Sequence, residues 1–523
     1  MSNLSYWEKR QVQDAFHYFE EAEKKASQIS SLYYRASRYL SMEAEEIFEK
    51  YQTKHGLSEI EAKRLLNTLQ DKTSLEELLQ KLKNSDTEDK KTMRAQLEAP
   101  AYRARLERMA GLQQQIDDVM QNVYAQEKLI STEFYTSLAK EAYYRSIFRM
   151  QQRAEAAFSF SHISAKTIER VLNSRWSGEN YSKRIWENTQ SLGEELKEEL
   201  LLNLITGRTE REAAKCIADR FGKGYVYARR LIRTESNYVT TTLNLESYAA
   251  CDVKEYQFLA TLDLRTSEIC RELDGAILPV SSAVVGKNCP PMHPWCRSTT
   301  VSVVDRTLLS KLKRAAIDPK TGKYIKVPRD MTYRQWYEKY VKGKPEVELE
   351  EKKTKNRSSD RAQYRKYKEM LGKDIPETLD EFQDLKYNET EKWSYTKLAY
   401  KRRAELLQNP EKKLPNAENV ILPEGKFTKY LFDGEHSNGL AKGRAISSRL
   451  GYSIENWQEF RDAIQKGAVK YPAVLKESDG HGQRYEQKMV LMGLKNNPAN
   501  VVVGWIQRPN GEVSMTSAYL KEV

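Results

Sequence analysis

The sequence predicts a multidomain protein. Its N-terminal and central regions are mostly α-helical with a small β-rich element that contains cysteine and histidine, and its C-terminal domain is a small α+β fold. Three observations predict this class: apolar residues recur at helical steps early in the chain, β-branched runs begin at Glu255, and helix-like and strand-like patterns follow one another beyond Asn416. A length of 523 residues is too great for one ordinary domain. We therefore divide the chain into a helical region (1–160), a central domain (161–305), a basic, partly disordered helical connector (306–410) and an α+β domain (411–523).

Helical periodicity dominates the first half of the chain. Apolar residues recur at three- and four-residue steps from about Tyr6 to Tyr51, and Ser58 with Glu61 has the pattern of a capping box that opens a further helix. Pro100 separates this part from later helices. Further on, we expect a helix that runs toward Phe221 to end at the glycines at 222 and 224.

The composition changes at Glu255. Three short β-branched or aromatic runs are bounded by turn residues, which predicts a small sheet. The runs are 256–261, 276–280 and 299–304. Further along, the charged low-complexity run 345–360 is expected to be disordered.

The last region has the pattern of a compact α+β domain. Helices are expected at 441–450 and 454–466, and they are followed by a meander of strands. The expected strands cover 473–477, 483–494, 501–507 and 513–519. Pro509-Asn510-Gly511 is a hairpin turn between the last two strands.

Charge and cysteine content narrow the functional classes. Lysine and arginine number 86 against 74 acidic residues, a net charge of +12, which favours an anionic partner such as RNA or packaged DNA. No run approaches the roughly 18 apolar residues of a membrane helix, and the N-terminal residues lack the apolar core of a signal peptide, so we expect no membrane partner and synthesis in a cytoplasm. Five cysteines do not form a secreted disulfide framework.

One short stretch collects metal-ligand residue types. Cys270, Cys289, His293 and Cys296 include three of the five cysteines and one of six histidines. Sulfur and imidazole are the ligands that zinc prefers, so these four residues predict a structural zinc site that would stabilise the small sheet. A loop with buried thiols and a solvent-facing histidine, or a disulfide, are the alternatives.

The same stretch resembles the core of the phage Mu F-like minor head proteins. The resemblance rests on Leu262 to Ser267, Leu273-Asp274-Gly275 and Pro290 to Arg297, preceded by the helix motif Ala228 to Glu235. It implies a component of the phage head that is associated with the portal and other head proteins and is packaged in few copies. Many members end in Cys-Arg-Cys, whereas here Arg297 is followed by Ser298, so that a further ligand is absent.

Beyond Asn416 the chain resembles the polymorphic toxin type 50 domain. The motifs that carry this resemblance are Lys426 to Leu431, Glu435-His436, Lys442 to Ala445 and Gly482 to Glu486, with Thr516 to Tyr519 at the end. The family is a predicted ribonuclease with a barnase, EndoU, colicin and RelE-like fold. The resemblance implies an RNA substrate, no cofactor for this domain and a cognate immunity protein.

The residue types in these motifs suit metal-free RNA cleavage, which needs proton transfer and cations that hold the phosphate. We take His436 as the proton-transfer group, because histidine titrates near neutral pH. The phosphate candidates are Lys442, Arg444 and Arg484, and Thr516 and Tyr519 are hydroxyl donors.

Each of these residues also has an ordinary structural reading. His436 suits a helix cap, Lys442 and Arg444 a solvated helix face, Arg484 an edge-strand ion pair and Tyr519 the core. No metal-binding nuclease motif occurs in this domain, which disfavours a metal-dependent enzyme.

The sequence thus favours a virion protein, made in the host cytoplasm, whose C-terminal toxin enters the recipient cytoplasm with the DNA and cleaves RNA without metal. The main alternative is a purely structural head protein whose last domain binds nucleic acid without catalysis. A third possibility is a toxin that acts on nucleotides or DNA.

Overall fold

The computed structural model describes residues 4–48, 100–154, 160–206, 210–303, 313–434, 436–478 and 481–522. They form two compact units, 1–344 and 345–523, which we call unit 1 and unit 2. The expected fold class is confirmed: unit 1 is mostly helical with small sheets, and unit 2 contains a four-stranded sheet with helices. The capping box expected at Ser58 and Glu61 lies outside the described residues.

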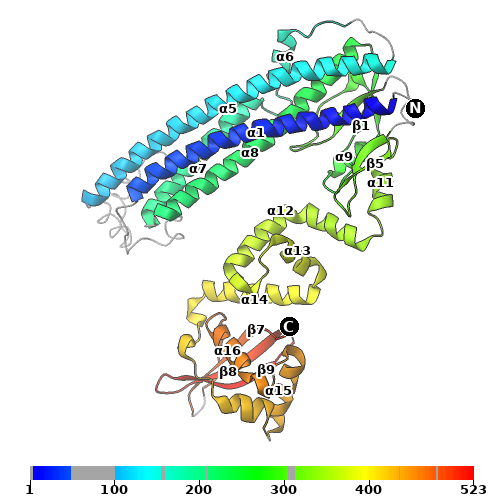
Figure 1. Cartoon of the computed structure of the whole chain (residues 1–523). Coiled ribbons are helices and arrows are strands. Elements are labelled where there is room, and N and C mark those ends of the chain that lie inside the picture. Colours follow the sequence, from blue (N-terminus) through cyan, green and yellow to red (C-terminus); the bar gives the residue numbers. More distant parts are fainter. Residues whose placement is uncertain are drawn as a thin grey trace. The chain divides into compact units, whose positions relative to one another are not determined.

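In the described residues, unit 1 is built on four long helices that lie side by side (Figure 1). They are α1 (Leu4–Phe48), α5 (Pro100–Ala154), α7 (Tyr181–Thr206) and α8 (Glu210–Ala250), with the short α6 (Ala165–Leu172) beside them. Ala22, Ala26, Ile29 and Tyr33 follow the helical period along one face of α1 and are buried. The apolar stripes of the helices therefore form one shared core.

Helix α8 corrects the expectation that the glycines at 222 and 224 end a helix, because it continues through both. A Cβ at Gly224 would lie 2.8 Å from a Leu192 methyl carbon of α7 and 3.0 Å from the Tyr33 ring of α1. Gly224 therefore permits close helix packing, and the tertiary contacts outweigh its roughly 1 kcal/mol helix cost relative to alanine.

A small antiparallel sheet follows the helices, with strand order β2-β1-β3. Its elements are β1 (Glu255–Leu259), α9 (Glu268–Leu273), β2 (Ile277–Pro279), η1 (Val280–Ser282) and β3 (Thr299–Val303). The hairpin β4 (Lys313–Ile317) and β5 (Tyr324–Pro328) and the helix α11 (Tyr333–Tyr340) complete the unit. The Asn237 amide of α8 donates to the carbonyls of Cys296 and Ser298, which ties the sheet to the helical bundle.

Unit 2 begins with helices where disorder was expected. Residues 345–360 form the first part of α12 (Pro345–Leu371), so that expectation was wrong. Asp360 explains part of the difference, since this carboxylate is buried and accepts hydrogen bonds from Gln383 (2.7 Å), Lys386 (2.6 Å) and Tyr387 (2.8 Å). The charged run is thus held by a partner helix. The helices after it are η2 (Gly372–Asp374), α13 (Leu379–Asn388), α14 (Thr390–Gln408) and η3 (Pro410–Lys412).

The rest of unit 2 is a four-stranded antiparallel meander with helices, in the order β6-β7-β8-β9. The strands are β6 (Ala473–Leu475), β7 (Gln483–Met492), β8 (Pro498–Gln507) and β9 (Val513–Leu520). The helices are η4 (Ala417–Asn419), the π-helix η5 (Lys426–Phe432), α15 (Ser437–Leu450), η6 (Ile454–Asn456) and α16 (Trp457–Ala468). Trp505 and Val503 of the sheet share one core with Tyr367, Phe382 and Ala399 of α12–α14.

Candidate functional site

Two glycines place helix α15 against the π-helix η5. A Cβ at Gly439 would lie 2.2 Å from the carbonyl oxygen of Tyr430, and a Cβ at Gly443 would lie 1.8 Å from that of Leu431. Both glycines are buried and are four residues apart, so they occupy one face of the helix. Only glycine permits this approach, which brings the first half of α15 next to Tyr430.

A series of contacts runs from the start of α15 to the edge strand β9. The imidazole of His436, the residue before α15, lies 5.2 Å from the Tyr430 ring, measured between centroids. The Lys442 ammonium donates to the Tyr430 hydroxyl at 3.4 Å and lies 5.5 Å from the centroid of the Tyr519 ring. The ammonium of Lys426 lies 5.4 Å from the Tyr430 ring centroid. Tyr430 thus joins His436 to Lys442, and Lys442 in turn contacts Tyr519.

The remaining strand residues share one face of the sheet with Tyr519. Arg484 and Glu486 alternate along β7 with core residues, and Glu486 lies opposite Gly504 of β8. A β-bulge at Gly504 turns Thr516 toward this face, where its hydroxyl oxygen would lie only 2.7 Å from a Cβ at Gly504. Arg484, Thr516 and Tyr519 are therefore presented on one half-buried face whose other side is the core of the unit.

One predicted residue is not brought to this site. Arg444 lies two positions after Lys442 on α15, which turns it about 200° around the helix axis, and it is exposed. The prediction missed Tyr430 and Glu486 as members of the site. Both stand inside motifs already recognised in the sequence, yet only the close packing of α15 on η5 and the strand register show what they touch.

The electrostatics of the site combine cations, a carboxylate and a phenol. Partial burial, and then the negative charge of Glu486, raise the pKa of Tyr519, so that its hydroxyl stays protonated at neutral pH and can donate a hydrogen bond. Lys476 and Lys488 lie 3.7 and 3.9 Å from the Glu486 carboxylate. The face thus presents cations and hydroxyls that can bind an anion, together with the Glu486 carboxylate, while the His436 imidazole lies beside Tyr430 at the start of α15.

A second cluster lies in unit 1, where the structure brings together three of the four predicted metal ligands. The ligand atoms of Cys270, His293 and Cys296 lie within 4.8 Å of one another. The Cys270 sulfur is 3.5 Å from Nε2 of His293 and 3.8 Å from the Cys296 sulfur. Hydrogen bonding with Cys270, and also with His293, lowers the pKa of Cys296.

Cys289 is not part of this group. It is fully buried in the core of the helical bundle, and this burial raises the pKa of its thiol to about 12. The four-ligand set expected from the sequence therefore needs correction, because Cys289 packs in a different apolar cluster from Cys270 and Cys296. In the described residues this leaves two sulfurs and one imidazole that can hold a metal.

Buried ion pairs fix the loops around this cluster. Arg297 binds the buried Asp263 carboxylate through both of its terminal nitrogens. Asp274 accepts from Arg314 at 2.9 Å and from the backbone amides of Ala260 and Tyr333. The residues that carry the family resemblance in the sequence thus include structural ion pairs of the small sheet.

Comparison with known families identifies two segments of the chain. Residues 194–301 match the family described as Phage Mu protein F like protein. The matched segment includes the second half of the helical bundle, the small sheet and the Cys/His cluster. The finding supports a phage head protein. Residues 413–522, which contain the sheet-face site, match a domain of unknown function, DUF6883, so this match does not assign an activity.

Among curated proteins, an NAD(+)--arginine ADP-ribosyltransferase, EFV, of Enterococcus faecalis is 25% identical over 219 residues. The alignment covers 39% of this chain, and the chain spans 45% of the length of that protein. Because the alignment is longer than unit 2, it includes part of unit 1. No solved structure matches. None of the described helices combines the length and apolarity that a membrane-spanning helix requires.

Proposed function

We propose that this chain is a phage minor head protein whose unit 2 cleaves RNA without a metal ion. The observation that carries the enzymatic part is the contact series from His436 through Tyr430 and Lys442 to Tyr519, which joins residues from η5, α15 and β9 at one place. The head assignment is supported by the family match at 194–301.

The proposed reaction is attack of the RNA 2'-hydroxyl on the adjacent phosphorus, with departure of the 5'-oxygen. A base removes the 2'-proton, cations stabilise the charge that grows on the phosphate, and an acid protonates the leaving oxygen. Lys442 and Arg484 hold the phosphate, with the hydroxyls of Thr516 and Tyr519 as neutral donors. His436 and Glu486 are the two groups that exchange protons, and no step needs a metal.

A second candidate function is nucleic-acid binding without catalysis. The net charge of +12 favours it, because a basic chain attracts phosphate backbones without any reactive group. In that case the lysines of the site only hold packaged DNA, and unit 2 is a structural part of the head.

The test is incubation of the full-length chain with total RNA in EDTA, alongside His436→Asn. His436 makes no side-chain cap hydrogen bond to α15, and asparagine is favoured at this position before a helix but cannot transfer a proton. We expect RNA cleavage by the unmodified chain and a loss of at least about a hundredfold in the variant. Intact RNA from a folded chain that binds RNA in a salt-dependent manner would support the second function instead.

One lysine variant and one arginine variant of α15 form a matched pair. Lys442→Ala removes the ammonium between Tyr430 and Tyr519, whereas Arg444→Ala removes an exposed charge of the same sign two residues away. We expect Lys442→Ala to lower cleavage strongly and Arg444→Ala to leave it nearly unchanged. Equal losses in both variants would mean that α15 contributes only overall charge. A single-stranded DNA substrate, tested in parallel, separates a ribonuclease from an enzyme that acts on DNA.

We further propose that Cys270, His293 and Cys296 bind zinc in unit 1. The donor set fits zinc, since two sulfurs and one imidazole already lie within 4.8 Å of one another. Three protein ligands leave one position for water or for a group from outside the cluster. The metal would join the helix α9 to the Pro-rich turn and so stabilise a sheet that has little core of its own.

The proposed head function and the proposed ribonuclease of unit 2 together suggest how the enzyme is delivered to a recipient cell. A head protein near the portal would enter the recipient cell with the DNA and carry unit 2 into its cytoplasm, and the producing cell would need an immunity protein. Detection of unit 2 in the recipient cytoplasm after infection is the expected result. Its retention in emptied capsids would rule this route out.

A further inference from the structure

An exposed row of aromatic and basic side chains runs along helix α8 in unit 1. Between positions 223 and 233 this helix contains four lysine or arginine residues and no aspartate or glutamate. Two apolar side chains stand among these cations and are more than half exposed, and a tryptophan from the Pro-rich turn before β3 joins them. We call the row the α8 face; it consists of Lys223, Val226, Tyr227, Arg230 and Trp295.

Each aromatic ring of the α8 face lies against arginine. The guanidinium carbon of Arg230 is 4.7 Å from the centroid of the Tyr227 ring. Those of Arg229 and Arg233 are 5.8 and 5.4 Å from the centroid of the Trp295 ring. These contacts hold the rings in place by cation–π attraction. Tyr227 is 52% exposed and Trp295 is 36% exposed, so part of each ring remains accessible to another flat group.

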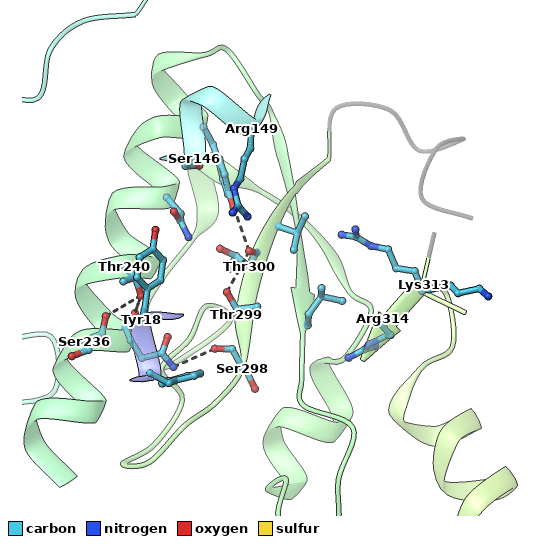
Figure 2. A pocket seen from close by; sticks show the side chains of 17 residues that line it. Tyr18, Ser146, Arg149, Ser236, Thr240, Ser298, Thr299, Thr300, Lys313 and Arg314 are labelled. Carbon is cyan, nitrogen blue, oxygen red and sulfur yellow. Dashed lines mark hydrogen bonds between the residues drawn. The ribbon is translucent and has the colours of Figure 1, made fainter. Parts of the chain in front are cut away.

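The backbone of Trp295 has an unfavourable conformation that two contacts with α8 maintain. Its φ of 66° lies in the left-handed region, which bulky residues rarely adopt. Its amide donates to Oγ1 of Thr234 at 3.1 Å, and the Asn237 amide donates to the carbonyls of Cys296 and Ser298. Figure 2 shows Ser298 at this junction of α8 with the small sheet. Strained residues that the surrounding structure holds in place are concentrated at functional sites, which makes Trp295 a candidate contact residue.

The α8 face carries uncompensated positive charge. Within the described residues, Lys223 and Arg230 form no ion pair with a carboxylate. Behind them, the single carboxylate of Glu23 on α1 is shared between Arg229 at 2.9 Å and Arg233 at 2.5 Å. A surface with more cations than carboxylates attracts an anionic partner.

We propose that the α8 face binds single-stranded nucleic acid. Bases stack on Tyr227 and Trp295, and Lys223 and Arg230 contact the phosphates, since exposed rings beside cations are the features that bind single strands without sequence preference. Tyr227 and the Arg233 that contacts Trp295 are separated by about 9 Å along the helix axis, a span that a few nucleotides can bridge. The face belongs to unit 1 and shares no residue with the candidate site of unit 2, so this binding is independent of the proposed RNA cleavage.

The test is fluorescence anisotropy of a labelled oligothymidylate with the full-length chain. DNA lacks the 2'-hydroxyl that the proposed cleavage needs, and a Lys442→Ala substitution in every chain weakens binding of the probe at unit 2. In this parent chain we expect the Kd to rise roughly tenfold on Tyr227→Ala and on Trp295→Ala. Tyr227→Phe keeps the ring and should bind like the parent. Tyr34→Ala is the matched control, because Tyr34 is 67% exposed on α1 of the same bundle.

The salt dependence of binding separates phosphate contacts from stacking. Lys223→Gln should reduce the slope of log Kd against log salt concentration by about 0.7, the value for one phosphate contact with a single strand. Tyr227→Ala should raise the Kd at every salt concentration and leave the slope unchanged. A slope that is the same in Lys223→Gln and the parent would overturn the phosphate contact.

Three results would overturn the proposal as a whole. The first is an equal Kd for the parent and Tyr227→Ala; because this exposed side chain lies outside the core, that variant keeps the test valid if Trp295→Ala does not fold. The second is equal binding of a strand of the same length without bases, or tighter binding of a duplex, since phosphate contacts alone would then explain the affinity. The third is no binding of the probe, which would point instead to an acidic protein surface, because tryptophan, tyrosine and arginine also dominate protein interfaces.

A competition experiment identifies the kind of strand. The competitors are unlabelled oligothymidylate and a 2'-O-methyl oligouridylate, which cannot undergo the proposed 2'-hydroxyl attack. Stronger competition by the first indicates single-stranded DNA as the natural ligand, and stronger competition by the second indicates RNA. Competition that persists unchanged in Tyr227→Ala and Trp295→Ala would place the binding elsewhere and overturn the assignment to the α8 face.

Discussion

Glu127 allows a quantitative prediction about the helical bundle. This α5 residue is 1% exposed and accepts a hydrogen bond from the Tyr33 hydroxyl at 2.8 Å, and that hydroxyl accepts one from the Asn188 amide at 2.9 Å. Burial is the main cause that raises the pKa of Glu127 from 4.5 to about 7, while the Tyr33 hydrogen bond opposes it. The folded protein therefore holds this proton more tightly than the unfolded chain does.

The sign and size of the effect follow from linkage. Because the folded-state pKa is the higher one, the stabilising contribution of the neutral carboxyl is complete below about pH 4.5 and is lost as pH rises through about 7. The difference of roughly 2.5 pH units corresponds to about 3 kcal/mol. Glu127→Gln stays neutral, and its amide oxygen can accept from Tyr33. The free energy of unfolding of the variant should therefore gain about 3 kcal/mol relative to the unmodified chain between pH 4.5 and 8.

The assay is hydrogen exchange of α5 amides in the full-length chain, read by mass spectrometry over this pH range and corrected for intrinsic exchange rates. Glu235, whose pKa burial also raises to about 7, titrates in both chains and cancels in the comparison. Glu133→Gln is the matched control, because it changes an exposed glutamate of the same helix. Parallel pH profiles for Glu127→Gln and the unmodified chain would refute the reasoning.

Three further predictions concern packing, metal and charge. Gly443→Ala should push α15 away from Leu431 and lower RNA cleavage and the melting temperature together, whereas a loss of neither would show that α15 adjusts freely. Elemental analysis should find about one zinc per chain and none in Cys296→Ser; a variant that keeps its zinc would exclude these ligands. Arg314→Met leaves the buried Asp274 carboxylate without its cation and should cost about 3–5 kcal/mol in urea unfolding of unit 1, while a cost below about 1 kcal/mol would contradict the pairing.

Local patterns predicted much of the fold. The helix expected at 441–450 ends at Gly451, which adopts a left-handed conformation with φ of 79°, and the expected strands of unit 2 form one meander. Errors arose where distant contacts decide the structure. Gly224 lies inside a helix because Tyr33 of α1 and Leu192 of α7 pack closely against it. The segment 345–360 is helical because side chains of α13 donate hydrogen bonds to the buried Asp360 carboxylate.

In the candidate sites, too, local patterns identified residues, whereas contacts between distant segments decide which of them lie together. Residue types in motifs indicated His436, Lys442 and Tyr519, yet their proximity depends on α15 packing against η5 and reaching β9, which no local pattern encodes. Spacing likewise suggested four ligands in unit 1. In the structure Cys289 packs in the core of the helical bundle instead, which the spacing of the cysteines does not reveal.

The shared core of unit 2 determines where a gene fusion could separate this unit from the rest of the chain. The family match begins at residue 413, but Arg402 and Arg403 of α14 bond Asn500 and Tyr471 across that border. A gene fusion joined at residue 413 would omit α12–α14, whose side chains cover part of the apolar core of this domain. That part of the core would then be exposed to solvent. A gene fusion expected to keep this core whole would therefore include residues 345–523, with its junction near Lys344.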